Sequence, residues 1–302
     1  MHGASSAEGF SGKRIDAFES EREGIAVEKR SITIWLILMI LTAAFLAFPL
    51  RPLLNRRTMG MPAAQAAKKG RSGKALKFNP PTIESAPFGI IDAVNLGFNV
   101  MVDTQRYAAG YVGNKLKCKN CHFEGGMTRG GSSGGISLVG VTVACSERGE
   151  KGHTEDLAFR INTCFKRNLN GRPLPENSKE LQGLMAYFRW ISKDLPVRSN
   201  IPWLGLKSIK SSHKPDTETG RKAFDKNCAI CHGGNGEGMH GPPTWGPGSF
   251  SDGSDMANPK VLGSFIHSNM PYRNPLLKVE EALDLAGYIA SQPRPHFKPG
   301  NR

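Results

Sequence analysis

The pentapeptide Cys-x-x-Cys-His occurs twice, at residues 118–122 and at residues 228–232, and it constrains the fold more than any other feature of the chain. Two thiols on one turn can each form a thioether with the same porphyrin, while the adjacent imidazole lies beneath the iron as its proximal ligand. We therefore predict two covalently bound haem c groups. Their attachment residues and proximal ligands would be Cys118, Cys121 and His122 in the first motif, and Cys228, Cys231 and His232 in the second.

The chain repeats itself around these motifs. A glycine stands eight residues before each of them, Gly110 in the first half and Gly220 in the second. Each half then ends in a segment whose apolar residues recur at helical spacing, residues 178–193 and residues 278–292. The sequence thus predicts an all-α fold of two tandem cytochrome c domains, residues 83–200 around the first haem and residues 201–302 around the second.

Residues 31–50 (SITIWLILMILTAAFLAFPL) carry no charged side chain. At 1.5 Å per residue, a helix of about 20 residues spans a hydrocarbon core of about 30 Å. We predict a transmembrane anchor, preceded by a cytoplasmic tail at residues 1–30 and followed by a basic, flexible linker at residues 51–82. A cleaved signal peptide is the alternative, but the charged region before it would be unusually long and no clear cleavage site follows.

The orientation of the anchor follows from the haem motifs. In bacteria haem c is attached outside the cytoplasmic membrane, so both haem domains would face the periplasm from a single-pass protein of the inner membrane. The formal net charge of +14 is concentrated, since residues 51–82 hold eight Lys or Arg and no Asp or Glu. Beyond residue 82 there are 27 basic and 20 acidic residues, so the folded part is only mildly basic and we expect no nucleic-acid partner.

The sixth iron ligand determines much of the chemistry of a haem, because methionine raises its potential and thiolate increases the electron density on iron. In the second half Met270 lies 38 residues after His232, far enough for the chain to reach the opposite haem face. Met239 is too close to His232, and Met256 is a weaker candidate. We predict Met270 as the distal ligand of an electron-transfer haem.

The first half has no methionine at the matching place. Cys164 lies 42 residues after His122, with Arg160 one helical turn before it. A thiolate ligand needs a lowered pKa, which nearby cations supply. A disulfide between Cys145 and Cys164 would explain the same residue in an oxidising compartment. The other residues considered for this position are Met127, which is too near His122, and His153 and Met185.

Several segments resemble the dihaem thiosulfate dehydrogenases. In the first half these are Gly-Tyr-Val-Gly-Asn-Lys-Leu-Lys-Cys at residues 110–118, Arg-Ile-Asn-x-Cys-Phe-x-Arg at residues 160–167 and Asn-Gly-x-x-Leu-Pro at residues 170–175. In the second half they are Gly-Pro-Pro-x-Trp-Gly-Pro at residues 241–247, Asn-Met-Pro at residues 269–271 and Gln-Pro-Arg-Pro at residues 292–295. The resemblance covers roughly residues 85–297.

This resemblance implies a first haem ligated by His122 and Cys164 and a second ligated by His232 and Met270. It also implies the activity: two thiosulfates are coupled to tetrathionate, reversibly, through a sulfur–sulfur adduct at the ligating cysteine, and two electrons pass to a redox partner. Thiosulfate is a dianion, which guanidinium groups bind through charge-assisted hydrogen bonds. Arg160 matches the family pattern, and Arg148 matches a Ser-x-Arg segment less closely.

The chain departs from the family at a few positions. Cys145 has no assigned role, Asn168-Leu169 replaces Ser-Met, and Asn269 precedes Met270 where some relatives carry a lysine that competes for iron. The main alternative function is a membrane-anchored dihaem electron carrier without catalysis, in which Cys164 is structural. A dihaem peroxidase lacks a convincing histidine for its low-potential haem, and the haem subunit of a sulfur-oxidising carrier complex would need a different second domain.

Overall fold

The computed structural model describes residues 76–145, 153–196 and 200–298, which belong to one compact unit at residues 73–302. The secondary structure in these ranges is helical, without a β-strand, and an isolated bridge joins Ser137 to Gly205. The all-α prediction is confirmed for this part of the chain. No helix within it is long and apolar enough to cross a membrane. The predicted anchor at residues 31–50 lies outside the described residues.

In the first half, helix α2 (Ile91–Val102) packs against helix α6 (Lys179–Ser192). The two helices meet at Gly97, where a Cβ atom would lie only 2.2 Å from the carbonyl oxygen of Gly183. The remaining elements of this half are η1 (Ile83–Ser85), α3 (Thr104–Tyr107), η2 (Ala109–Tyr111), η3 (Cys118–Asn120), η4 (Phe123–Gly126), α4 (Val141–Cys145) and α5 (His153–Arg167).

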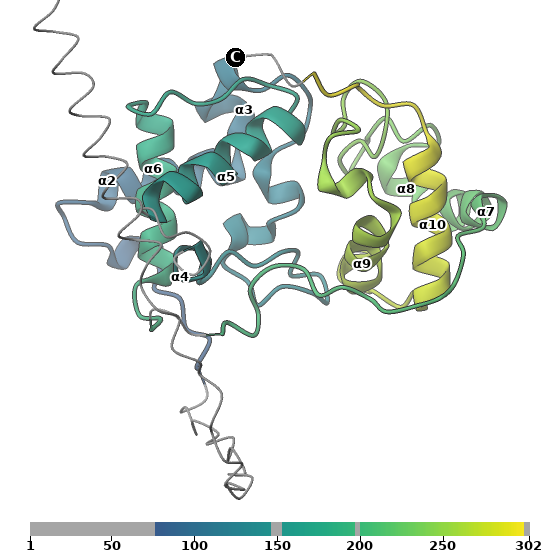
Figure 1. Cartoon of the computed structure of the whole chain (residues 1–302), viewed down its shortest axis with the longest axis horizontal. Coiled ribbons are helices and arrows are strands. Elements are labelled where there is room, and N and C mark those ends of the chain that lie inside the picture. The colour runs from purple at the N-terminus through teal and green to yellow at the C-terminus, as the bar shows by residue number, and fades with distance from the viewer. Residues whose placement is uncertain (1–75, 146–152, 197–199, 299–302) are drawn as a thin grey trace, which may run out of the picture. The chain divides into compact units, whose positions relative to one another are not determined.

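The second half repeats this arrangement with helices α7 (Thr217–Asn227) and α10 (Val279–Ser291). Here a Cβ atom on Gly220 would lie 2.1 Å from the carbonyl oxygen of Asp284. Helix α10 lies between α7 and α9 (Pro259–Asn269), as Figure 1 shows. The half also contains α8 (Ala229–His232) and η5 (Asp255–Ala257).

Gly110 is not the counterpart of Gly220, although both stand eight residues before a haem motif. Gly110 lies in η2, and the nearest atom to a Cβ placed there is Nη2 of Arg172 at 3.5 Å. The glycine at the helix crossing of the first half is Gly97. The first half inserts α3 and η2 between its crossing helix and its motif, so two glycines at the same distance from their motifs have different structural roles.

The two closing helices are where the periodicity predicted them. Residues 178–193 contain α6, whose N-cap Ser178 accepts a hydrogen bond from the backbone N–H of Leu181. Residues 278–292 contain α10, and at its start Glu281 accepts a hydrogen bond of 2.8 Å from the backbone N–H of Lys278. Such caps satisfy N–H groups that have no partner within the helix and thereby fix where each helix begins.

Candidate functional site

The second motif forms a short helix that presents a histidine. Cys228 is the N-cap of α8, His232 is its last residue, and Gly233 follows as the C-cap with a φ of 83°. The Nδ1 atom of His232 lies 2.7 Å from the carbonyl oxygen of Pro242. When Nδ1 carries the proton and donates to this carbonyl, Nε2 is left as the atom that can bind a metal. Burial lowers the pKa of His232, which favours the neutral imidazole that such ligation requires.

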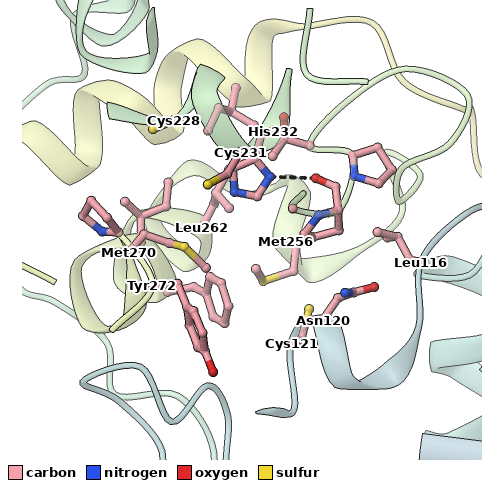
Figure 2. Close-up of a pocket in the computed structure, with 18 of the residues that line it drawn as sticks. Leu116, Asn120, Cys121, Cys228, Cys231, His232, Met256, Leu262, Met270 and Tyr272 are labelled. Carbon is pink, nitrogen blue, oxygen red and sulfur yellow. Dashed lines mark hydrogen bonds between the residues drawn. The ribbon is translucent and has the colours of Figure 1, made fainter. Parts of the chain in front are cut away.

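Met270 and His232 line the same cavity, whose volume is about 590 Å³. Met270 immediately follows α9, where its backbone N–H donates a 2.8 Å hydrogen bond to Ile266. Figure 2 shows its side chain pointing into the cavity together with that of Met256, which lies toward Cys121. Met239 is 66% exposed and is absent from the cavity lining.

The residues around this cavity fit a covalently attached haem. The sulfur-bearing Cys228 and Cys231 stand beside His232, and burial raises the pKa of Cys228 to about 12. The remaining walls of the second half are largely apolar, as a porphyrin face requires. They include Phe224, Leu262, Ile266, Leu277 and Ile289.

The histidine of the first motif is oriented in the same way as that of the second, although the backbone conformation of the two motifs differs. Nδ1 of His122 lies 2.8 Å from the carbonyl oxygen of Ile136, so Nε2 is again the nitrogen available to a metal. Burial lowers the pKa of His122 as well. Thr104 fixes the start of the motif, because its hydroxyl accepts from the backbone N–H of Cys118 at 3.0 Å and donates to the sulfur at 3.3 Å.

Cys164 lies on α5, near the sulfur atoms of the first motif, and carries a free thiol. Its side chain is exposed, yet protein atoms crowd the sulfur enough for desolvation to raise the thiol pKa. Burial raises the pKa of Cys118 to about 11 and that of Cys121 to about 12, and in both the negative charge of the Cys164 thiolate contributes. The structure therefore places Cys164 close enough to Cys118 and Cys121 to interact with both electrostatically.

The other candidates for this position are placed elsewhere or are not described. Met185 is 2% exposed within the core of the first half, and Met127 packs against the same core. The side chains of Cys145 and His153, and the whole of Arg148, lie outside the described residues. Arg160 is exposed on α5, and its positive charge lowers the pKa of Cys164 against the effect of burial.

Two residues that the sequence did not indicate as site residues also act on Cys164. A hydrogen bond from the side chain of Asn168 lowers the thiol pKa, and the negative charge of Asp255 raises it. Ser254, the N-cap of η5, donates a 2.5 Å hydrogen bond to Oδ1 of Asn168. The only sequence signal was that Asn168 replaces a family serine, whereas nothing pointed to a loop of the second half.

The two motifs lie close together. Lys119, Asn120 and Cys121 of the first motif help to line the cavity that contains His232 and Met270, as Figure 2 shows for Asn120 and Cys121. Further contacts join the halves nearby, for example a 2.9 Å hydrogen bond from Nδ2 of Asn114 to the carbonyl oxygen of Ser249. Two redox groups held at these motifs would thus be neighbours.

Comparisons with known proteins match both halves of the chain. The Cytochrome c family model matches residues 217–293. A thiosulfate dehydrogenase of Thiomonas intermedia is 36% identical over 234 residues, which cover 74% of this chain and 73% of the relative. A thiosulfate dehydrogenase of Allochromatium vinosum is 31% identical over 228 residues, covering 72% and 84% respectively.

A solved structure matches as well. It is the thiosulfate dehydrogenase TsdBA from Marichromatium purpuratum, with a TM-score of 0.65 and 26% sequence identity. The match covers 74% of this chain and 50% of that chain, so the present chain spans about half the length of the solved one.

Proposed function

The chain belongs to the thiosulfate dehydrogenase family, and we propose that it oxidises two thiosulfate ions to one tetrathionate at a haem ligated by His122 and Cys164. It is an oxidoreductase of this type, and its cytochrome c domain carries covalent haem c. The observation that carries the proposal is the position of Cys164 on α5, close enough to Cys118 and Cys121 of the first motif to interact electrostatically with both. In the second half a methionine takes the corresponding role.

The proposal includes two haems. Support comes from the matching histidines, which both direct Nδ1 to a backbone carbonyl oxygen and leave Nε2 for iron. The haems supply one-electron redox chemistry, and two of them suffice for the two electrons that tetrathionate formation releases. Cys118 and Cys121 would hold the first haem, and Cys228 and Cys231 the second.

Cys164 is proposed as the sulfur nucleophile of the reaction. Its thiolate would form a sulfur–sulfur bond with the terminal sulfur of one thiosulfate, an oxidation that releases two electrons, for which the haems would be the acceptors. A second thiosulfate then attacks that terminal sulfur, tetrathionate departs, and the thiolate is restored, so that charge and atoms balance. This second step is a thiol–disulfide type of exchange, in which a thiolate is a good leaving group.

Arg160 and Arg148 are proposed to bind the thiosulfate dianion. Guanidinium groups form charge-assisted, often bidentate hydrogen bonds to oxyanions of this kind. Arg160 is supported by its place one turn before Cys164 on α5 and by its effect on the thiol pKa. Arg148 is carried over from the family pattern alone.

Electrons are proposed to leave through the haem ligated by His232 and Met270, since methionine ligation raises the potential. The acceptor would be a cytochrome, an oxidase or another membrane electron-transfer complex. Residues 31–50 would anchor the protein in the inner membrane, with residues 83–200 and 201–302 as periplasmic haem domains. Membrane fractionation of the full chain, compared with a chain that lacks residues 31–50, tests this placement.

Thiosulfate added anaerobically to the oxidised holoprotein tests the function. We expect the haem α-bands to show reduction and tetrathionate to appear. Cys164→Ala should retain both haems and lose turnover, whereas Thr163→Ala on the same helix should behave as wild type. Normal turnover by Cys164→Ala would contradict the assignment of the nucleophile, and an unreduced wild type would favour the non-catalytic electron carrier.

A further inference from the structure

The backbone beside Met270 is held by the first half of the chain. Asn269, the residue before Met270, is 0% exposed. Its Oδ1 atom accepts a 2.8 Å hydrogen bond from the backbone N–H of Gly135, and its Nδ2 atom donates a 3.1 Å bond to the carbonyl oxygen of Phe265. Both polar atoms of the buried amide are thus hydrogen-bonded, Nδ2 to α9 and Oδ1 to the first half of the chain.

Ser133 contacts the same segment at three points. Its hydroxyl donates to the carbonyl oxygen of Asn269 at 3.2 Å and accepts from the backbone N–H of Arg273 at 2.5 Å. Its own backbone N–H donates to the carbonyl oxygen of Ser268 at 3.3 Å. The polar groups on both sides of Met270 therefore find partners on one loop of the first half.

An aromatic contact reinforces this attachment. Phe123 directly follows His122 and meets two aromatic rings edge-on, Phe265 at 6.0 Å and Tyr272 at 5.3 Å between centroids. Phe265 precedes Met270 on α9 and Tyr272 follows it. Edge-to-face pairs of this kind contribute beyond the area that they bury, so the Met270 segment is held by packing as well as by hydrogen bonds.

The opposite end of the same loop positions the first histidine. Ile136 accepts the hydrogen bond of His122 through its carbonyl oxygen, and its N–H donates to the carbonyl oxygen of Cys121 at 2.8 Å. Gly135 has a φ of 70°, and a Cβ atom there would lie 2.5 Å from that same Cys121 oxygen. The loop is thus fixed against the first motif by contacts that leave it little room to move.

We propose that Asn269 and Ser133 are positioning residues that keep Met270 on the second haem. Together with Gly135 they form what we call the clasp. The inference rests on the proposed ligation by Met270 and goes beyond it, because it makes the ligand of the second haem depend on the first half. Without the clasp, the segment that carries Met270 would leave its position more often and expose the iron to other ligands.

The test uses the full-length holoprotein with Asn269→Leu and Ser133→Ala. Leucine resembles asparagine in size but leaves the N–H of Gly135 buried without a partner. Both variants should weaken the charge-transfer band from the methionine sulfur to iron in the oxidised protein and lower the midpoint potential of the second haem. Imidazole should bind the second haem about tenfold more tightly, since one buried hydrogen bond has been lost and the open fraction is larger.

Two matched controls isolate the clasp. Ser132→Ala is the same substitution one residue earlier, also at a positive φ, and Asn274→Leu changes an exposed asparagine on the Met270 loop. Both controls should keep the wild-type band, potential and imidazole affinity. Should Asn269→Leu and Ser133→Ala lower thermal stability yet leave these three properties unchanged, the two residues are structural only and the proposal is wrong.

The same spectra test the role of the clasp separately from the ligation by Met270, on which the proposal rests. Met270→Ala should abolish the charge-transfer band completely and leave the first haem unchanged. A wild-type protein without the band would show that Met270 is not the ligand, and both assignments would then fall. A wild-type band that persists in Asn269→Leu and Ser133→Ala would overturn the clasp and leave the ligation by Met270 standing.

Discussion

Nδ1 of His122 lies 2.8 Å from the carbonyl oxygen of Ile136, although the two residues are fourteen positions apart in the chain. His232 makes the equivalent bond of 2.7 Å to Pro242, ten positions away. In each half, therefore, the loop that returns after the motif determines which imidazole nitrogen is free for iron. The loops differ in sequence and length, so the common element is a correctly placed backbone carbonyl and not a particular side chain.

Gly135→Ala should displace the carbonyl of Ile136 from His122. The new Cβ would lie 2.5 Å from the carbonyl oxygen of Cys121, at a φ of 70° that alanine adopts only with strain. We expect the free energy of unfolding, measured by urea denaturation, to fall by about 2 kcal/mol. We also expect the electron paramagnetic resonance spectrum of the first haem to change.

Gly205→Ala is the matched control for Gly135→Ala. Its φ is 77°, but a Cβ there has no atom within 4 Å. The control therefore carries the cost of the left-handed backbone without the clash. An equal loss of stability in the two variants, with both haem spectra unchanged, would show that the contact of Gly135 with the first motif has no structural importance.

Gly97→Ala and Gly220→Ala should each destabilise the half of the chain in which the glycine lies. At both positions a Cβ meets a backbone carbonyl oxygen, Gly183 at 2.2 Å and Asp284 at 2.1 Å, so the helices would have to separate. Overpacking of this kind costs roughly 1–3 kcal/mol. Urea denaturation of the haem-loaded variants measures it, with Gly89→Ala as control because a Cβ there meets nothing within 4 Å. Variants as stable as this control would contradict the close crossing.

The sequence predicted the local features of the fold well, because each depended on residues close together in the chain. The haem motifs are short, and the closing helices show their own periodicity and caps. The crossing at Gly97 was missed, since it depends on a helix nearly ninety residues later, at Gly183. The repeat of a glycine eight residues before each motif drew attention to Gly110 and not to Gly97, and no local signal marks Gly97 as the crossing residue.

The candidate site shows the same contrast between local features, which the sequence indicated, and long-range contacts, which it did not. Cys164 was predicted as a site residue because it stands where the second half has Met270, in a segment that resembles a family. The contribution of the second half to the Cys164 site was not recognised. The hydrogen bond from Ser254 to Asn168 joins residues 86 positions apart, and both residue types are common in loops. Contacts of this range arise from the packing of the two halves, which local pattern does not encode.

Stability should fall on acidification partly through Asp216, the N-cap of α7. Hydrogen bonds from the backbone N–H groups of Thr219 and Glu218 lower the pKa of its carboxyl group. The stabilisation is present above the pKa of the unfolded chain, near 4, and is lost as the pH falls through the lower folded pKa. Asp216→Asn, which caps equally well, should be less sensitive below about pH 4.

Asp216→Ala completes this comparison, because it removes the cap at every pH. It should unfold more easily than wild type near neutrality, whereas Asp216→Asn should not. Thermal unfolding of the holoprotein followed across the acidic range measures both effects. If Asp216→Asn and the wild type lose stability in parallel on acidification, the carboxylate of Asp216 does not contribute to the pH dependence.

Arg160→Ala should lower kcat/KM for thiosulfate by roughly 10- to 100-fold, because a charge-assisted hydrogen bond contributes about 1.5–3 kcal/mol. Arg160→Lys should recover part of this loss. The control is Arg167→Ala, at the end of the same helix, where the guanidinium lies 5.3 Å from the ring centroid of Phe297. Steady-state kinetics with a ferric acceptor provides the measurement.

Arg160 has two possible routes of action, which the pH profile separates. Its positive charge lowers the pKa of the Cys164 thiol, so its removal would leave less thiolate at neutral pH. A defect caused by that route diminishes as the pH is raised, whereas a defect in binding the thiosulfate dianion persists at all pH values and appears mainly in KM. We expect the persistent defect. A loss of activity that disappears at high pH would make Arg160 a residue that activates Cys164 and not one that binds substrate.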